Sequence, residues 1–432
     1  MTPTTSLKPA SESAIAPIRV DAPAADRGGL YQSIVFKVLD RMDQGRLRIT
    51  LPDGGERMFG DPSQVASSSI RILSNEFFRK CVLYGDVGFG EAYVDGDWET
   101  DDITAVIRWL ILNVEKSPAM SGSKANSWMV NLLSILNRAY HLVRPNSVSK
   151  SRDNIREHYD LGNEFYRLFL DSSMTYSSGL FRTGEEELTA AQEAKYERLC
   201  QQLRLKPTDH VLEIGGGWGG FCCYAAKRYG CRVTAVTISK AQLDYAAQRV
   251  VREGVDDRVR IVLQDYRHIT GQYDKIVSIE MLEAVGDAYF ETYFAKCSEV
   301  LKKDGLLAVQ MITCPDDRYE SFRKGVDWIQ KHIFPGSLLP SIGRVNCAVN
   351  KTGSLFLHDL HDMGTSYTRT LQIWRERFNA NLAGVRDLGF TDAFIRKWNY
   401  YLSYCEAAFG MRNISVVQAV YTRPNNPVLT EN

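Results

Sequence analysis

The stretch HVLEIGGGWGG (210–220) decides the fold, because a short apolar run is followed directly by a cluster of glycines. The apolar run predicts a buried strand, and the glycines predict a tight turn that opens a helix. Glycine lets the backbone approach a ligand closely, and the helix N-terminus offers free amide groups. We therefore expect a nucleotide-like ligand at this turn.

Short apolar runs alternate with helical patterns in the sequence that follows this turn. The expected strands are 210–214, 231–236, 258–263, 273–279 and 305–312, with helices after Gly219, Ser239 and Asp287. Such alternation is typical of a parallel sheet covered by helices. A long insertion is expected at 315–350, an aromatic-rich helical stretch at 380–409 and a closing strand at 413–423. Residues 146–425 are thus predicted to form one α/β domain.

The preceding part of the chain has a different pattern. Residues 29–145 are predicted to form a smaller α+β domain, with a helix near 31–42 and a hairpin that turns at Asp53-Gly54. A polar, basic stretch that contains Pro145 places the domain boundary near residue 150. Residues 1–28 are read as a disordered tail. They are not read as a signal peptide, because they lack the basic start and the apolar run that such a peptide needs.

Bulk composition excludes several classes of function. Lys and Arg total 52, and Asp and Glu total 52, so no overall charge attracts nucleic acid. The nine cysteines show no C-x-x-C spacing, which argues against a metal site and favours a reducing, cytoplasmic location.

The charges around the glycine loop favour one cofactor over another. Gly215, Gly217 and Gly220 satisfy G-x-G-x-x-G, so a dinucleotide is considered, but no acid ends the second strand to bind its ribose. The acid is Glu213, before the glycines, where it complements the positive amino group and sulfonium of S-adenosylmethionine. Farther along, Asp265 could accept the adenine amino hydrogen and Tyr266 could cover the base.

Several longer motifs carry a family resemblance. They are NIREHYDLGNEFYRLFLDSSMTYSSGLF (154–181), VLEIGGGWGG (211–220), VTISKAQ (236–242), LQDYR (263–267), SIEMLEAVG (278–286), IFPGSLLPS (333–341) and SYTRTLQIWRERF (366–378). Together they resemble the cyclopropane fatty acid synthases and related lipid C-methyltransferases. The resemblance implies a Rossmann-like class I methyltransferase sheet and S-adenosylmethionine as the cofactor.

The resemblance also implies a set of cofactor-binding residues. Besides Glu213, these are Tyr176, Ser177, Gly215, Gly216, Gly217, Trp218, Gly219, Thr237, Ile238, Gln242, Asp265, Tyr266 and Arg267. In this assignment the Gln242 amide binds the ribose in place of an acid.

The reaction implied is attack of a lipid C=C bond on the sulfonium methyl, followed by proton loss and closure of a cyclopropane ring. Many family members hold a bicarbonate ion as the base, with a Cys, a Glu, a His and a Tyr. Glu283 and Tyr367 match this set, whereas Ser178 and Gln310 replace the Cys and the His. Both can still donate hydrogen bonds to an anion, so bicarbonate and Glu283 itself both remain candidate bases.

Other interpretations stay open at the same positions. The Ser and Gln choice, with Glu280 in SIEMLEAVG, is similar to the plant-type branch, which favours ring formation; a different proton loss would leave a methylene or methyl branch. N-methylation of a small amine and a lipid-binding protein without activity are the rival functions. Cys405 matches a cysteine once proposed as catalytic, with packing as the alternative. Glu280 could share a helical face with Glu283 or cap its loop.

Acyl-chain substrates imply contact with a bilayer. Apolar residues including Trp109, Leu110 and Trp128 precede a basic run from Arg138 to Arg156, a pairing that suits an interfacial helix on anionic head groups. The alternative is a helix that packs between domains. We expect a protein peripheral to the inner face of the membrane that binds phospholipid acyl chains and no nucleic acid, and a homodimer is compatible with the sequence.

Overall fold

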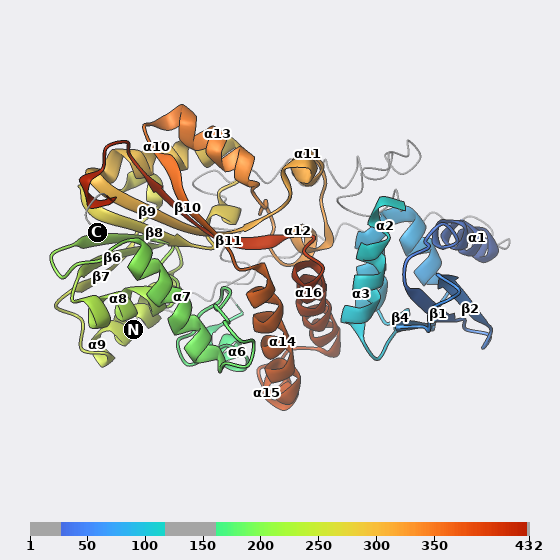
Figure 1. Cartoon of the computed structure of the whole chain (residues 1–432). Coiled ribbons are helices and arrows are strands. Elements are labelled where there is room, and N and C mark those ends of the chain that lie inside the picture. The colour runs from blue at the N-terminus through green and yellow to red at the C-terminus, as the bar shows by residue number, and fades with distance from the viewer. Residues whose placement is uncertain (1–26, 117–160, 430–432) are drawn as a thin grey trace, which may run out of the picture.

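The computed structural model describes residues 27–116 and 161–429, which form two sheets joined through helices (Figure 1). The larger sheet has the strand order β10-β11-β9-β8-β5-β6-β7. Its strands are β5 (His210–Ile214), β6 (Arg232–Thr237), β7 (Val259–Leu263), β8 (Tyr273–Ile279), β9 (Leu301–Thr313), β10 (Phe356–Asp362) and β11 (Ser415–Thr422). Strands β5 to β9 run parallel, and β11 is antiparallel to both of its neighbours.

Helices cover both faces of this sheet. On one face lie α7 (Leu188–Gln202), α8 (Gly220–Tyr229) and α9 (Lys240–Arg252), and on the other lie α10 (Phe290–Val300) and α13 (Ile342–Thr352) (Figure 1). Alternate residues of β5 enter the two cores, since Val211 packs with α7 and α8 whereas Leu212 packs with α10. The predicted Rossmann-like α/β sheet is confirmed.

In this sheet the expected strands agree with the structure to within a few residues, and one of its strands, β10, was missed. Strand β10 lies at the sheet edge and pairs only with β11, and its side chains alternate between exposed and half-buried. An edge strand of this kind tolerates acids and histidines, so FLHDLHD lacks the apolar signal of a buried strand.

The smaller sheet belongs to the amino-terminal part of the chain. Its order is β2-β1-β3-β4, with β1 (Arg46–Thr50), β2 (Glu56–Gly60), β3 (Ser68–Ile72) and β4 (Trp98–Glu99), beside α1 (Arg27–Leu39), α2 (Glu76–Val94) and α3 (Ile103–Leu112). The hairpin expected at Asp53-Gly54 is β1–β2. The boundary predicted near residue 150 and residues 1–26 of the predicted tail lie outside the described residues. Helix α1 begins at Arg27, so it includes the last two residues of the expected tail, 27 and 28.

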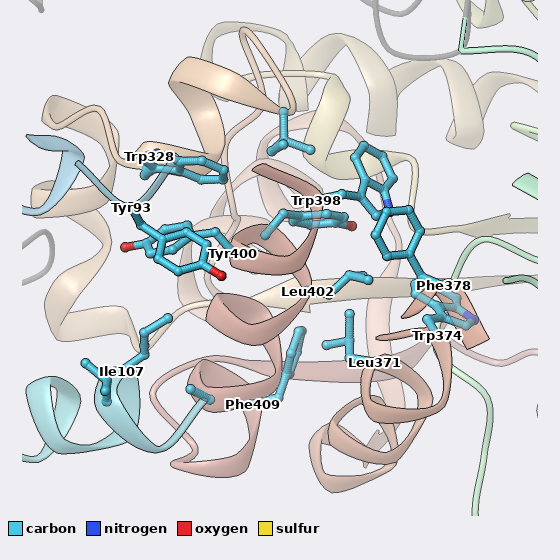
Figure 2. Close-up of a cluster of buried hydrophobic side chains, with 14 of the residues drawn as sticks. Tyr93, Ile107, Trp328, Leu371, Trp374, Phe378, Trp398, Tyr400, Leu402 and Phe409 are labelled. Carbon is cyan, nitrogen blue, oxygen red and sulfur yellow. The ribbon is translucent and has the colours of Figure 1, made fainter. Parts of the chain in front are cut away.

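A layer of helices joins the two sheets. It comprises α6 (Asn163–Arg167), α11 (Tyr319–Lys324), α12 (Trp328–His332), α14 (Gly364–Ala380), α15 (Leu382–Asp387) and α16 (Asp392–Gly410). Helix α16 packs against α14 on one side and against α2 and α3 on the other (Figure 1). At the centre of this contact the Tyr400 ring lies 4.6 Å from that of Trp328 and 5.8 Å from that of Tyr93 (Figure 2).

The prediction that Trp109 contacts a membrane surface is wrong. Trp109 is 1% exposed and lies in the core between α3 and the first sheet. Helix α3 is thus a domain-packing helix, the alternative reading. The other residues of that hypothesis, from Trp128 to Arg156, lie outside the described residues. Over the described ranges, no helix is both long enough and apolar enough to cross a bilayer.

Candidate active site

The glycine loop forms one wall of a cavity at the carboxyl ends of the parallel strands. Gly215 and Gly217 have φ values of +89° and +51°, a region that side chains with a Cβ rarely adopt. A Cβ at Gly215 would lie 2.9 Å from the Met281 side chain, whereas a Cβ at Gly217 would meet no atom within 4 Å. The space in front of Gly217 therefore belongs to the cavity and is open to a ligand.

Glu213 supplies the negative charge expected beside this loop. Its side chain is 3% exposed, and in the described part of the chain its Oε2 atom has no hydrogen-bond partner. Burial raises the pKa of Glu213 to about 8. A buried acceptor without a donor is costly. The positive amino group of S-adenosylmethionine would satisfy this oxygen, so the residues present fit that cofactor.

The ends of β6 and β7 supply polar groups to the same cavity. The Thr237 hydroxyl donates to Oε1 of Gln242 (2.8 Å), an arrangement that leaves the Gln242 amide hydrogens for a ligand. The Asp265 carboxylate accepts from Nε (2.8 Å) and Nη2 (2.7 Å) of Arg267. Both Asp265 oxygens are thus already engaged by Arg267, next to the Tyr266 ring.

The segment before α7 closes the cavity over the loop. The Tyr176 ring stacks on Trp374 with centroids 5.2 Å apart, and its hydroxyl lies 2.8 Å from that of Tyr401. Ser177 Oγ accepts a hydrogen bond of 2.7 Å from Lys195 Nζ. Lys195 is fully buried, and burial lowers its pKa to about 7. Sequence reasoning missed Lys195, because a lysine in a helix is ordinarily solvated.

Two carboxyl groups follow β8 at the opposite wall. Glu283 Oε1 accepts from the Ile312 backbone N–H, and within the described residues its Oε2 is buried without a partner. Burial, with the nearby negative charge of Glu280, raises the pKa of Glu283 to about 8. Tyr367, on α14, donates its hydroxyl hydrogen to Glu280 Oε2 (2.8 Å) and not to Glu283.

Ser178 and Gln310 also surround Glu280. The Ser178 backbone N–H and Gln310 Nε2 both donate to Glu280 Oε1, at 2.9 and 2.8 Å. The Ser178 hydroxyl itself donates to the Gly179 carbonyl (2.8 Å). The groups expected to hold a dissolved anion are therefore engaged within the protein. Sequence reasoning gave Glu280 only a minor place, although its position in SIEMLEAVG was a usable signal.

The cavity brings together most of the predicted site residues. Those that line it are Tyr176, Ser177, Glu213, Gly215, Gly216, Gly217, Trp218, Thr237, Ile238, Gln242, Asp265, Tyr266, Arg267, Glu283, Tyr367 and Cys405. Gly219, Ser178 and Gln310 stand behind its wall; Gly219 precedes α8 with φ +84°, and the other two are fully buried. Burial keeps the pKa of the Cys405 thiol far above its usual range, so Cys405 is a neutral wall residue here.

Beyond the carboxyl groups the cavity is apolar and aromatic. Its walls there come from α11, α12, α14 and α16 and include Phe322, Ile329, Phe334, Leu371, Tyr401, Tyr404, Ala408 and Phe409. One cavity thus has a polar end at the glycine loop and an apolar end between the helices. Across residues 27–116 and 161–429, no group of three His, Cys, Asp or Glu side chains is arranged to hold a metal ion.

The chain is similar to known proteins over most of its length. The model of the mycolic acid cyclopropane synthetase family matches residues 146–419. The chain is 36% identical over 399 residues to tuberculostearic acid methyltransferase UfaA1 of Mycobacterium tuberculosis, covering 88% of each protein. It is also 36% identical over 361 residues to the cyclopropane-fatty-acyl-phospholipid synthase of Escherichia coli, covering 83% of this chain and 88% of that one.

Solved structures agree with the family match. Mycolic acid cyclopropane synthase CmaA1, in complex with SAH and CTAB, superposes with a TM-score of 0.58 at 28% identity, over 63% of this chain and 98% of that one. Coclaurine N-methyltransferase shares the fold, with a TM-score of 0.61 at 21% identity over 78% of this chain and 99% of that one. The chain belongs to the cyclopropane synthetase family and is an S-adenosylmethionine-dependent methyltransferase that modifies lipids.

Proposed function

We propose that the protein transfers a one-carbon unit from S-adenosylmethionine to the double bond of an unsaturated acyl chain in a phospholipid and closes a cyclopropane ring. The observation that carries this proposal is the continuous cavity, with a cofactor end at Glu213 and Gly217, carboxyl groups at its middle and an apolar end between α14 and α16. The match to the Escherichia coli phospholipid synthase supports the same substrate class.

Each group of residues in the cavity has a separate role in the proposed reaction. Glu213 binds the cofactor's amino group, and the glycine loop admits its backbone approach. The apolar wall aligns the double bond with the methyl group and keeps water out, which a weak alkene nucleophile requires. Glu283 and Tyr367 lie where the polar and apolar ends of the cavity meet. They act on the formation of the carbocation and on its loss of a proton. Cys405 belongs to the apolar wall.

A methylene-branched acyl chain is a second candidate product, because UfaA1, matched over 88% of both chains, is a tuberculostearic acid methyltransferase. If a hydride first moves from the methylated carbon to its cationic neighbour, the methyl group of the resulting carbocation can lose a proton, and a methylene branch remains in place of a ring. Reduction of that branch would need a separate hydride donor. Ring and methylene products contain the same atoms, so they differ in structure and not in mass.

The experiment uses purified protein, vesicles of palmitoyl-oleoyl-phosphatidylglycerol and S-adenosylmethionine carrying a trideuterated methyl group. Ring or methylene formation leaves two of the three deuterium atoms in the lipid, whereas simple methylation of an amine leaves all three. Chromatography against authentic cyclopropane and methylene standards then identifies the product. Unlabelled lipid after full incubation would refute the proposed substrate class, and a methylene product would refute ring formation.

Membrane contact and the inner-face location remain part of the proposal. An acyl chain inside a bilayer can enter the cavity only if the protein docks on that bilayer, whatever surface it uses. Flotation with anionic vesicles tests docking. Cross-linking tests the homodimer.

A further inference from the structure

Glu280 has an unusual backbone for a residue with a long side chain. It comes directly after β8 with φ +49°, a left-handed conformation that costs a non-glycine residue roughly 1–2 kcal/mol. Its backbone N–H donates to the Gln310 carbonyl (2.8 Å), which fixes the bend. Strain of this kind clusters at functional sites, where the surroundings hold it in place.

The bend aims the Glu280 carboxylate at three donors from three separate segments. Oε1 accepts from the Ser178 backbone N–H and from Gln310 Nε2, and Oε2 accepts from the Tyr367 hydroxyl. The Gln310 amide is itself oriented, because its Oε1 accepts from Gln418 Nε2 (3.0 Å). Three convergent donors make a binding site for one carboxylate, and the chain fills that site with its own side chain.

Glu280 also borders the reaction space. It lines the cavity together with Glu283 and Met281. Oε2 accepts one hydrogen bond within the described residues, and a carboxylate oxygen has two lone pairs, so one lone pair is left to accept a proton. When Lys195 is protonated, its charge, held behind Ser177, favours the ionised form of Glu280.

The neighbouring Glu283 is held differently. It has a single backbone donor, from Ile312, and no other partner within the described residues. Burial raises the pKa of both carboxyl groups, and that of Glu283 rises to about 8, partly because Glu280 is negative. Two close carboxyl groups whose surroundings differ in this way take different protonation states. The three donors favour the ionised form of Glu280, whereas Glu283, with a single donor, favours its protonated form.

We propose that Glu280 is the proton acceptor of the reaction, and that the protein therefore works without a dissolved bicarbonate ion. This assignment rests on the proposed function. The alkene π electrons form the bond to the methyl carbon, and the carbon–sulfur bond breaks with its electron pair left on sulfur. A C–H bond of the transferred methyl then breaks, its electron pair closes the ring, and the proton passes to Glu280 Oε2.

The test compares three proteins in buffer stripped of carbon dioxide, with oleoyl-phosphatidylglycerol vesicles and labelled S-adenosylmethionine. The parent protein should keep its full rate, and added bicarbonate should not raise it. Glu280→Gly should lose at least about 100-fold in turnover, as expected for a lost general base. Glycine suits φ +49°, so this variant should fold, and calorimetry should find its cofactor affinity retained.

Chemical rescue separates a base from a structural side chain. Removal of the Glu280 side chain vacates the site between Ser178, Gln310 and Tyr367, so formate or bicarbonate should restore the Glu280→Gly rate by at least about tenfold. The matched control is Glu280→Gln. It should be equally inactive, but its amide fills the space between the three donors. Formate should leave that variant inactive.

Three outcomes overturn the assignment while the proposed function stands: a parent enzyme that needs bicarbonate, a Glu280→Gln protein with more than about a tenth of the parent rate, or a folded, cofactor-binding Glu280→Gly protein that no small anion restores. A parent protein that labels no lipid at all would refute the proposed function, and this assignment with it.

Discussion

At the scale of single residues, the cofactor end depends on Gly217, which has a positive φ and faces open space, and on Glu213, which has one buried oxygen without a hydrogen-bond donor in the described residues. The first makes room for a ligand, and the second determines its charge. Each leads to a separate prediction.

Gly217→Val should abolish S-adenosylmethionine binding, because the new side chain would stand in the cofactor's space and a β-branched residue is strained at φ +51°. Isothermal calorimetry measures the loss. Gly389→Val is the matched control, since Gly389 also has a positive φ with no atom within 4 Å but does not line the cavity. Equal loss of binding in both variants would attribute the effect to backbone strain alone.

Cofactor affinity should rise with pH between about pH 6 and pH 7.5. The sign follows from Glu213, whose pKa burial raises to about 8. Below that pKa the carboxyl holds a proton, which it must release before it can pair with the cofactor's positive amino group. Lower pH therefore weakens binding. In Glu213→Gln the affinity should be weak and flat over the same range, and an equally steep slope there would assign the effect to another group.

At the scale of elements, the apolar end of the cavity is formed by the packing of α14 against α16. The two helices make extensive contact, and Leu371, Ala408 and Phe409 line the cavity; Leu371 and Phe409 are labelled in Figure 2. Ala408 is 3% exposed and lines the cavity, so its small size leaves room that a larger side chain would remove.

Ala408→Phe should lower the rate on oleoyl lipid by about tenfold or more, because it shortens the space for the acyl chain, at a cost in stability of about 1–3 kcal/mol. Cofactor affinity should not change, since Ala408 belongs to α16 and not to the predicted cofactor-binding residues at the ends of β5, β6 and β7. Competition between lipids of different chain length measures the effect, and the preference should move toward shorter chains. An unchanged preference would show that the acyl chain takes another path.

At the scale of the whole molecule, Arg396 links the first sheet to the layer of helices. The Arg396 guanidinium, on α16, donates to the backbone carbonyls of Tyr93 (2.6 Å) and Trp98 (2.9 Å) and lies over the Tyr93 ring at 4.1 Å. These contacts bind the first sheet to the helical layer that walls the cavity. Residues 27–116, which contain the first sheet, thereby support the active site, and none of them lines the cavity.

Arg396→Ala should lower the free energy of unfolding by about 2–4 kcal/mol, because it removes two hydrogen bonds from a charged donor and a cation–π contact. Calorimetric or denaturant unfolding measures the change. Arg386→Ala is the control: Arg386 pairs with the 80% exposed Asp392, so the loss should stay within about 0.5 kcal/mol. Equal effects would mean that the bridge contributes nothing to stability.

The sequence by itself determined the parts of this protein that depend on local pattern. The strands 210–214 and 273–279 were predicted with the bounds of β5 and β8, because a strand that is buried on both faces of a parallel sheet leaves a short, nearly continuous apolar run in the sequence. The glycine turn and Glu213 were readable for the same reason, since turn and charge lie within eight residues. The family resemblance added the residues of the cofactor end.

Only the tertiary structure decided how the chemical end of the cavity is assembled. Glu280 meets Ser178, Gln310 and Tyr367 across separations of 102, 30 and 87 residues, and no local pattern encodes contacts of that length. The burial of Lys195 and Trp109 likewise depends on which helices pack together, not on their neighbours in the chain. Convergence of distant side chains on one carboxylate is a property of packing, so it became visible only in the folded molecule.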